Sequence, residues 1–266
     1  MPDGSPLPPS PARMPDSVSI VIPAYEEERR LPPTLEQIAE WSKRCTFPME
    51  VLIVVEPGKD RTREIATAAA ASEPNLRVLT YERQRGKGHA VRTGMVAAEG
   101  TLIFYMDADL SVPLREADAF VEYFRMHPGA DVLVGNRQHA QSRITRAQSP
   151  LRQRLGQTFN LMLRGLGIAS VHDTQCGFKG FRRAAARAIF ARQRIDGFAF
   201  DVEVLLLAQK LGLRVVDLPV EWTNSDESKV RLFRDSAQML WDAWRVRKSL
   251  AMASRSKRSE PDSRSN

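Results

Sequence analysis

The stretch Thr101–Met106, TLIFYM, runs directly into Asp107-Ala108-Asp109 and constrains the fold more than any other part of the chain. A short apolar run of this kind is typical of a buried strand. Two carboxylates spaced two residues apart at its end suit a hard divalent cation, Mg²⁺ or Mn²⁺, which commonly also binds substrate phosphates. The alternative is an exposed turn after the strand, because Asp-x-Asp is also common by chance.

The chain around this stretch alternates between strand-like and helix-like segments. Strands are predicted at 18–22, 51–55, 76–80, 101–106 and 132–134, and helices at 35–41, 62–71, 90–98 and 113–127. This alternation predicts an α/β fold with a single mostly parallel sheet flanked by helices. Ligands of such sheets bind beyond the carboxyl ends of the strands. Four segments follow strand ends and are expected to meet there, which favours a functional Asp-x-Asp: Pro23–Glu27, Glu56–Asp60, Tyr81–Gly88 and Asp107–Ser111.

The second half of the chain is less regular. Residues 136–149 are polar and basic and are expected to form a long functional or disordered loop. Helices are predicted at 151–166 and 200–211 and a strand at 214–220. The pattern predicts four regions: a disordered proline-rich leader (1–16), a catalytic domain (17–228), an amphipathic C-terminal helix (229–250) and a disordered basic tail (251–266).

Composition narrows the class of partner. The 266-residue chain has a formal net charge of +7, which favours anionic partners such as nucleotides and phospholipid surfaces. No nucleic acid is expected, because aromatic residues are only 7% and no nucleic-acid-binding motif has the right spacing. No apolar run reaches the roughly 18 residues of a membrane-spanning helix. Two distant cysteines, Cys45 and Cys176, indicate a reduced, cytoplasmic setting.

Five motifs, in order, resemble those of glycosyltransferase family 2. They are Val18-Ser-Ile-Val-Ile-Pro-Ala-Tyr, Arg85-Gly-Lys-Gly, Met106-Asp-Ala-Asp-Leu, Asp173-Thr-Gln-Cys-Gly-Phe-Lys-Gly-Phe and Val220-Glu-Trp. The sequence is most similar to the dolichyl-phosphate (polyprenyl-phosphate) β-glucosyltransferase branch and is also similar to dolichyl-phosphate mannose synthases. The resemblance covers roughly residues 17 to 248. It implies the GT-A fold of nucleotide-diphospho-sugar transferases and a metal-dependent, inverting transfer of a hexose.

The resemblance assigns roles to the strand-end residues. Asp107 and Asp109 would hold Mg²⁺ or Mn²⁺, which neutralises charge on the departing nucleotide diphosphate. The nucleotide sugar would be bound by Pro23, Tyr25, Glu27, Glu56, Lys87 and Asp107. Carboxylates suit the N–H of uracil and the hydroxyls of ribose. The glycines beside Lys87 would let the backbone approach the donor, and its ammonium would lie near phosphate; alone, this segment also fits a helix-start turn with a solvated lysine.

The acceptor implied by the resemblance is a polyprenyl or dolichyl phosphate. Such a phosphate is already ionised and needs positioning by cations more than it needs a general base. Arg137 is the first candidate to bind it, followed by Arg143 and Arg146, although a solvated basic loop is the alternative. Asp173 is a catalytic-site carboxylate whose role is left open between general base and organiser of the acceptor loop.

Two departures from the family pattern leave the donor open. The usual Tyr-Asn-Glu is Tyr25-Glu26-Glu27, and the usual Val-Asp-Asp-Gly-Ser-x-Asp is Val55-Glu-Pro-Gly-Lys-Asp60. UDP-glucose is expected, and Ser111, where mannosyl relatives often carry Gln, weakly favours glucose. Three alternatives remain: a polyprenyl-phosphate mannosyltransferase using GDP-mannose, a soluble transferase with a hydroxyl acceptor, and a nucleotide-sugar-binding protein without turnover.

The C-terminal segment offers a route to a lipid acceptor. Residues 230–244 present an apolar helical face with two tryptophans, flanked by arginines. This pattern suits a helix lying in the plane of an anionic membrane surface, and packing of the tryptophans on the domain core is the alternative. The sequence therefore predicts a cytoplasmic protein, peripheral on the inner face of the membrane.

Overall fold

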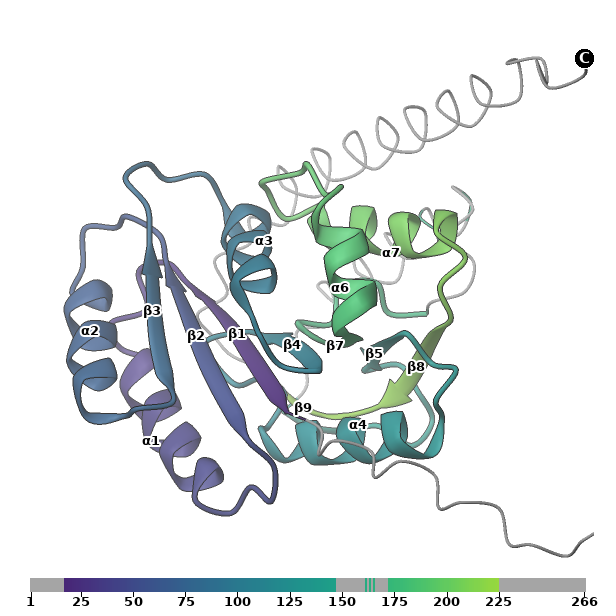
Figure 1. The fold of residues 1–266 in the computed structure, drawn as a ribbon, viewed down its shortest axis with the longest axis horizontal. Helices are drawn as coiled ribbons and strands as arrows, with labels where there is room; N and C mark the ends of the chain where they lie inside the picture. Colours follow the sequence, from purple (N-terminus) through teal and green to yellow (C-terminus); the bar gives the residue numbers. More distant parts are fainter. Residues whose placement is uncertain (1–16, 147–160, 162, 164, 166–171, 225–266) are drawn as a thin grey trace, which may run out of the picture.

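The computed structural model describes residues 17–146, 161, 163, 165 and 172–224 (Figure 1). Within these residues a seven-stranded sheet has the order β3-β2-β1-β4-β7-β5-β8. The strands are β1 (Val18–Ala24), β2 (Met49–Val55), β3 (Leu76–Thr80), β4 (Leu102–Met106), β5 (Val132–Asn136), β7 (Phe178–Arg182) and β8 (Val215–Pro219). β4 is buried along its whole length and pairs in parallel with β1, as the apolar TLIFYM run predicts.

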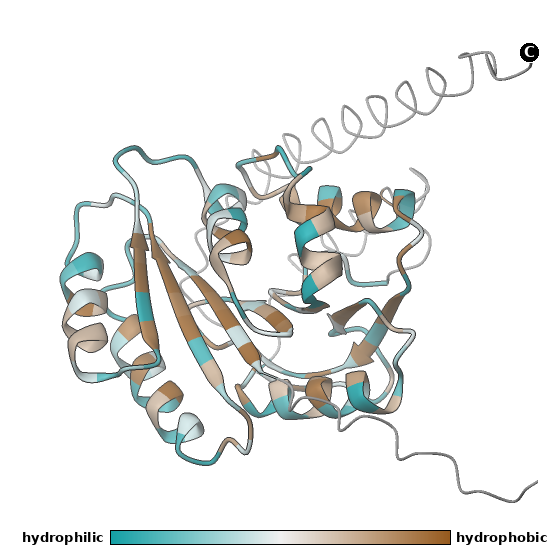
Figure 2. Cartoon of the chain, in the orientation of Figure 1, coloured by the Kyte–Doolittle hydropathy of each residue, from teal (hydrophilic) through white to brown (hydrophobic). Residues whose placement is uncertain are grey.

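Helices cover both faces of this sheet. They are α1 (Leu31–Ser42), α2 (Thr62–Ser72), α3 (Lys87–Ala97), α4 (Arg115–Met126), α6 (Arg183–Phe190) and α7 (Phe200–Lys210). Side chains of α1, α2 and α4 pack in one core cluster with alternate strand residues, and those of α3, α6 and α7 pack in the other. Figure 2 shows the apolar residues concentrated on the strands and on the helix faces that meet them. The predicted α/β architecture with a mostly parallel, helix-flanked sheet is therefore confirmed.

Two elements differ from the expectation. β7 is antiparallel to both β4 and β5, so the sheet is mixed at this point. The expected 136–149 loop contains a short strand, β6 (Arg143–Arg146), which pairs in parallel with β9 (Glu221–Thr223) in a separate two-stranded sheet. All four β6 residues are exposed, so the sequence carries no apolar alternation that would have revealed a strand.

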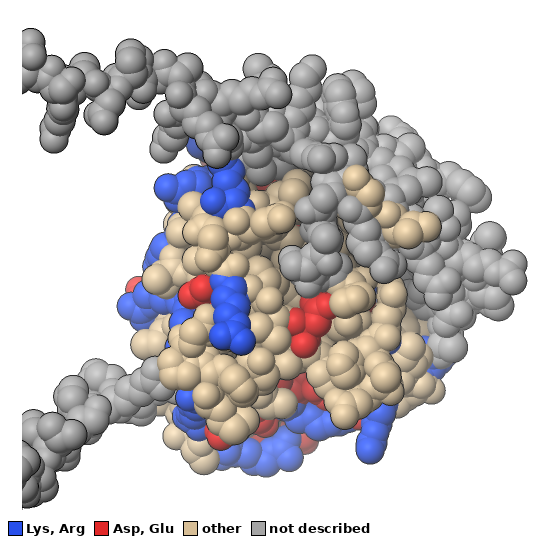
Figure 3. Space-filling view, turned by 90° about the vertical axis from the view of Figure 1, so that its right-hand side faces the viewer, with Lys and Arg blue, Asp and Glu red and all other residues tan. Residues whose placement is uncertain are grey.

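Several predicted regions lie outside the described residues: the 1–16 leader, most of the 151–166 helix, the 229–250 helix and the 251–266 tail. Among the helices that are described, none combines the length and apolar character needed to cross a membrane. The face of the molecule in Figure 3 carries lysine and arginine in separate patches around the described domain, in keeping with the net charge of +7.

Candidate functional site

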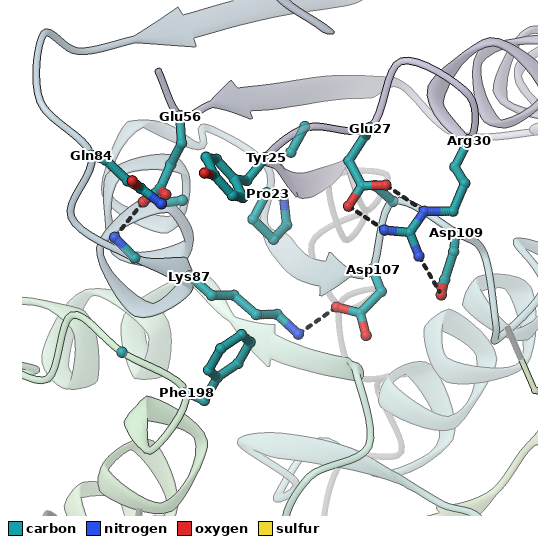
Figure 4. Close-up of a pocket in the computed structure, with 15 residues that line it drawn as sticks. Pro23, Tyr25, Glu27, Arg30, Glu56, Gln84, Lys87, Asp107, Asp109 and Phe198 are labelled. Atoms are coloured by element: carbon teal, nitrogen blue, oxygen red, sulfur yellow. Dashed lines mark hydrogen bonds and ion pairs between the residues drawn. The ribbon is translucent and has the colours of Figure 1, made fainter. Parts of the chain in front are cut away.

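A cavity of about 340 Å³ lies beyond the carboxyl ends of β1, β2 and β4, where the topology predicts a ligand site (Figure 4). The predicted residues that line it are Pro23, Tyr25, Glu27, Glu56, Lys87, Asp107 and Asp109. The sequence reasoning did not single out Arg30, Gln84, Gly197 and Phe198, which line the same cavity. All residues assigned to the nucleotide sugar and the metal therefore come together in one place.

The two carboxylates of the Asp-x-Asp motif have different partners. Asp107 Oδ1 lies 2.6 Å from Lys87 Nζ. Asp109 Oδ1 accepts hydrogen bonds from the backbone N–H (3.0 Å) and the hydroxyl (2.8 Å) of Ser111. Gly177 packs directly against Asp107, so that any side chain at this position would overlap the carboxylate. Asp107 is thus held between Lys87 on one side and the loop before β7 on the other.

Lys87 is the first residue of α3, and its ammonium forms an ion pair with Asp107 in the pocket. Burial alone would lower the pKa of Lys87, but the nearby carboxylates of Asp107 and Asp201 outweigh it and raise the pKa above its ordinary value. The side chain is therefore charged at neutral pH. A charged lysine at the edge of an open cavity suits an anionic ligand group such as a phosphate.

Arg30 brings a second cation to the pocket. Its Nε and Nη2 donate to the two carboxylate oxygens of Glu27 at 2.5 and 2.6 Å, and its Nη1 lies 3.7 Å from Asp109 Oδ2 (Figure 4). Glu27 is held in turn at its backbone, where its N–H donates to Thr62 Oγ1 at 2.6 Å. The carboxylate assigned to the nucleoside is thus part of an acid–base chain that reaches the Asp-x-Asp motif.

Glu56, in the unusual segment after β2, organises the loop that leads to Lys87. Its Oε1 accepts from the hydroxyl of Tyr81 at 2.8 Å and from the backbone N–H of Gly86. Burial and the Glu56 carboxylate raise the pKa of Tyr81, which keeps this tyrosine protonated as a donor. Glu56 still borders the cavity, so the altered segment keeps a carboxylate at the site.

The glycines on either side of Lys87 are packed closely against other parts of the protein. A Cβ at Gly88 would lie 2.6 Å from Phe200 Cβ and would overlap the carbonyl oxygen of Ile195. Gly86 has a φ of +121°, and a Cβ there would lie 2.6 Å from the Asp196 carbonyl oxygen. Both glycines are therefore required by the loop between α6 and α7, and their predicted role in letting the backbone approach the donor stays a prediction.

Glu26, between two pocket residues, has a φ of 51°, a left-handed conformation that a glutamate rarely adopts. Glu26→Asn is expected to raise the free energy of unfolding by about 0.5–1 kcal/mol, because asparagine tolerates this region with less strain. Urea unfolding measures the change. Glu26→Gln is the matched control, since it removes the charge but keeps the strained backbone. An equal gain in both variants would contradict the strain explanation.

Arg137 and Asp173 form a second cluster beside the pocket. Arg137 Nε and Nη2 donate to the two Asp173 oxygens at 2.7 and 2.8 Å, and the Arg137 backbone N–H donates to Oδ2 at 3.0 Å. Burial would raise the pKa of the fully buried Asp173, but Arg137 more than offsets this and lowers the pKa below its ordinary value. Asp173 is therefore a weak base, and its geometry fits the organising role.

The three candidate acceptor arginines differ in how they are held. Arg137 lies at the end of β5, with its guanidinium 5.5 Å from the Trp222 ring and its side chain 25% exposed. Arg143 and Arg146 are exposed at the two ends of β6, and neither lines the donor cavity. Arg137 is thus fixed by Asp173, whereas Arg143 and Arg146 remain candidates on a neighbouring surface.

Sequence reasoning missed a buried polar cluster beneath the pocket. Lys179 is completely buried in β7, and its Nζ donates to Asp201 Oδ1 at 2.6 Å and to the Cys176 carbonyl at 2.8 Å. The buried Tyr105 hydroxyl, from β4, donates to the same Asp201 oxygen. The cluster therefore connects β4, β7 and the first turn of α7 under the loop that abuts Asp107.

The donor set of the Asp-x-Asp motif fits a hard cation. Asp107 and Asp109 offer carboxylate oxygens, the ligands that Mg²⁺ and Mn²⁺ prefer. Among the described residues no group of three or more His, Cys, Asp or Glu side chains is arranged to hold a metal. A cation held here would thus take only a few protein ligands and would draw others from a bound diphosphate, as Mg²⁺ commonly does in nucleotide sites.

Comparison with known proteins agrees with this geometry. Residues 19–190 match the family model described as Glycosyl transferase family 2. A dolichyl-phosphate beta-glucosyltransferase of Dictyostelium discoideum is 34% identical over 240 residues, covering 86% of this chain and 73% of that protein. A dolichyl-phosphate beta-glucosyltransferase of Trichomonas vaginalis is 33% identical over 222 residues, covering 80% of this chain and 66% of that protein. The chain thus spans about two thirds to three quarters of the length of these relatives.

Solved structures show the same fold at lower identity. Mannosyl-3-phosphoglycerate synthase from Rubrobacter xylanophilus aligns with a TM-score of 0.65 and 18% identity, covering 90% of this chain and 76% of that one. Glucosyl-3-phosphoglycerate synthase from Mycobacterium tuberculosis, in complex with Mn²⁺ and UDP-glucose, aligns with a TM-score of 0.64 and 14% identity, covering 88% and 79%. These similarities confirm the predicted GT-A fold.

Proposed function

Because the chain belongs to glycosyl transferase family 2, we propose that it transfers glucose from UDP-glucose to a polyprenyl phosphate, the class that includes dolichyl phosphate. One observation carries the choice of acceptor. The buried carboxylates of Asp173, Asp201 and Glu27, in and beside the pocket, are each paired with a cation, namely Arg137, Lys179 and Arg30. Among the described residues, the remaining buried carboxylate of the pocket, Glu56, already accepts hydrogen bonds from Tyr81 and Gly86.

A hydroxyl acceptor would require a different arrangement. Such an acceptor must lose a proton as it attacks the sugar, and an efficient general base has a pKa near the operating pH. The pKa of Asp173 is lowered by Arg137, and the Asp201 oxygen that faces Lys179 also accepts from Tyr105. An acceptor phosphate brings its own negative oxygen and needs no such base, which supports the lipid phosphate over a sugar or metabolite hydroxyl.

The donor side would bind and orient the nucleotide sugar. Tyr25, Gln84 and Glu56 border the nucleoside end of the cavity, and Lys87 lies toward Asp107. The Lys87 ammonium would bind a donor phosphate. Asp107 and Asp109 would hold Mg²⁺ or Mn²⁺, and the cation would supply positive charge that stabilises the departing diphosphate. The pocket thus provides positioning and electrostatic stabilisation, the two contributions that a displacement at the anomeric carbon needs.

The acceptor side would rest on the Arg137–Asp173 pair. Asp173 holds two nitrogens and the backbone of Arg137, so the guanidinium plane is fixed before the acceptor arrives. A fixed guanidinium binds phosphate oxygens with little loss of conformational freedom. We retain Arg143 and Arg146 as further phosphate contacts, and the 229–250 segment as the contact with an anionic membrane surface.

An acceptor screen with the purified full chain and Mn²⁺ tests the proposal. We expect glucose transfer from UDP-glucose to a prenyl phosphate, and none to the prenol with the same chain, because the prenol lacks the ionised oxygen. Efficient transfer to the prenol would favour the hydroxyl-acceptor alternative. Preferential use of GDP-mannose would overturn the proposed donor, and no release of nucleotide diphosphate from either donor would overturn the enzymatic assignment.

A further inference from the structure

The loop between α6 and α7 is packed against the start of α3. Because Gly86, the residue before Lys87, offers no side chain to cap α3, the first N–H groups of the helix need another partner. The Asp196 carbonyl oxygen accepts from the N–H groups of Gly88 and His89 at 2.8 and 3.2 Å. A distant loop therefore caps the helix that begins with Lys87.

The carboxylate of Asp196 forms a second set of contacts between the α6–α7 loop and the segment around Lys87. It accepts from Arg92 Nη2 at 2.7 Å and from Arg85 Nε at 3.0 Å, and Arg85 Nη2 lies 2.8 Å away. His89 Nδ1 is 3.7 Å away. These three basic residues flank Lys87 on both sides in sequence, so one carboxylate ties the whole segment to the α6–α7 loop.

The residues that follow Asp196 reach the donor cavity. Gly197 and Phe198 both line it, and Figure 4 shows Phe198 beside the Lys87 side chain, across the cavity from Tyr25. Lys87 and Phe198 thus form one continuous wall whose two halves come from distant parts of the chain. Asp196 is the residue that joins the halves through both its carbonyl and its carboxylate.

We propose that Asp196 is a positioning residue for the donor, which holds Lys87 and Phe198 as one wall of the cavity. The role rests on the proposed function, because the wall is assigned to the sugar-diphosphate part of a nucleotide sugar. Asp196 does not line the cavity itself and acts through Lys87 and Phe198.

Asp196→Asn separates positioning from net charge, because the two explanations predict opposite signs. Removing a carboxylate beside an anionic donor would strengthen donor binding by charge alone and lower its KM. If Asp196 instead holds Lys87 and Phe198 in place, its loss would let them shift and would raise the KM for UDP-glucose by about tenfold, since small displacements of binding groups are costly. The KM for the prenyl phosphate is expected to stay within twofold. Asp196→Glu, which keeps the charge, is expected to restore most of the donor affinity.

Asp131→Asn is the control, because Asp131 is also a hydrogen-bonded carboxylate but lies before β5, at the opposite end of the sheet, where its Oδ2 accepts from the backbone N–H of Arg214 at 2.8 Å. Hydrogen exchange of the peptide containing 86–90, with no donor present, gives a readout independent of turnover, and Asp196→Asn is expected to accelerate it. An unchanged or lowered donor KM in a transferring enzyme would overturn the positioning role. If the wild type transferred no sugar, the proposed function would fail. In that case, unchanged hydrogen exchange of the 86–90 peptide in Asp196→Asn would separately overturn the Asp196 proposal.

Discussion

Asp107→Asn is expected to reduce glucose transfer by a factor on the order of 10³, while the melting temperature stays close to that of the wild type. Asp107 has two tasks in the proposed mechanism, holding the cation and pairing with Lys87 at 2.6 Å. An amide cannot supply the negative charge that either task needs. The side chain borders an open cavity, so its loss leaves no deeply buried group without a partner. Initial rates with UDP-glucose and prenyl phosphate, across a series of Mn²⁺ concentrations, measure the effect.

Asp118→Asn is the control for this prediction. Asp118 accepts weak hydrogen bonds of 3.3 Å from Trp41 Nε1 and does not line the donor cavity. We expect its activity to stay within about twofold of the wild type, as is usual for substitutions away from a site. A loss of less than tenfold in Asp107→Asn would show that the Asp-x-Asp motif does not carry the cation chemistry.

Lys179→Met is expected to lower the free energy of unfolding by about 3–5 kcal/mol, the usual cost of leaving one charge of a buried pair alone. Asp201 would lose its 2.6 Å partner while remaining almost completely buried. The Cys176 carbonyl would lose its donor as well. Urea unfolding at neutral pH measures the change.

A double-mutant cycle identifies the cause of that loss. Adding Asp201→Asn to Lys179→Met removes the uncompensated charge and keeps an acceptor for the Tyr105 hydroxyl. The double variant is expected to be more stable than the sum of the single losses predicts, by about 1–3 kcal/mol. Lys210→Met, at the exposed end of α7, controls for removing a lysine and is expected to change stability by less than about 0.5 kcal/mol. Strict additivity would show that Lys179 stabilises the fold through packing alone.

The sequence predicted the parallel part of the fold because its strands are continuous apolar runs. β4 shows this most clearly, since all five of its residues are buried. β7 carries Lys179 and Gly180 between phenylalanines, and its buried lysine is paired with Asp201, which lies 22 residues later in α7. No local pattern of hydrophobicity reports such a partner. β6 was expected to be loop because its four exposed residues, RITR, show no hydrophobic pattern of a strand, and its partner β9 lies far away in the sequence.

The site was predictable where it is built from strand ends and less so where it depends on tertiary contacts. Sequence reasoning placed Glu27, Lys87 and Asp107 together because parallel strands end at one edge. Arg30 follows Glu27 by three residues, so its i,i+3 spacing was a usable signal. Phe198 had no such signal, because it reaches the cavity on a loop fixed by contacts with α3.

The Arg137–Asp173 pair also connects two parts of the chain that are distant in sequence. Arg137 directly follows β5, and Asp173 lies shortly before β7 begins, so this one bidentate contact joins two positions that are 36 residues apart in the chain. The contact therefore ties the end of β5 to the segment that leads into β7, its antiparallel neighbour in the sheet. The pair is thus a clasp that fixes, through two side chains, the relative position of two segments which the chain itself joins only through the long stretch between them.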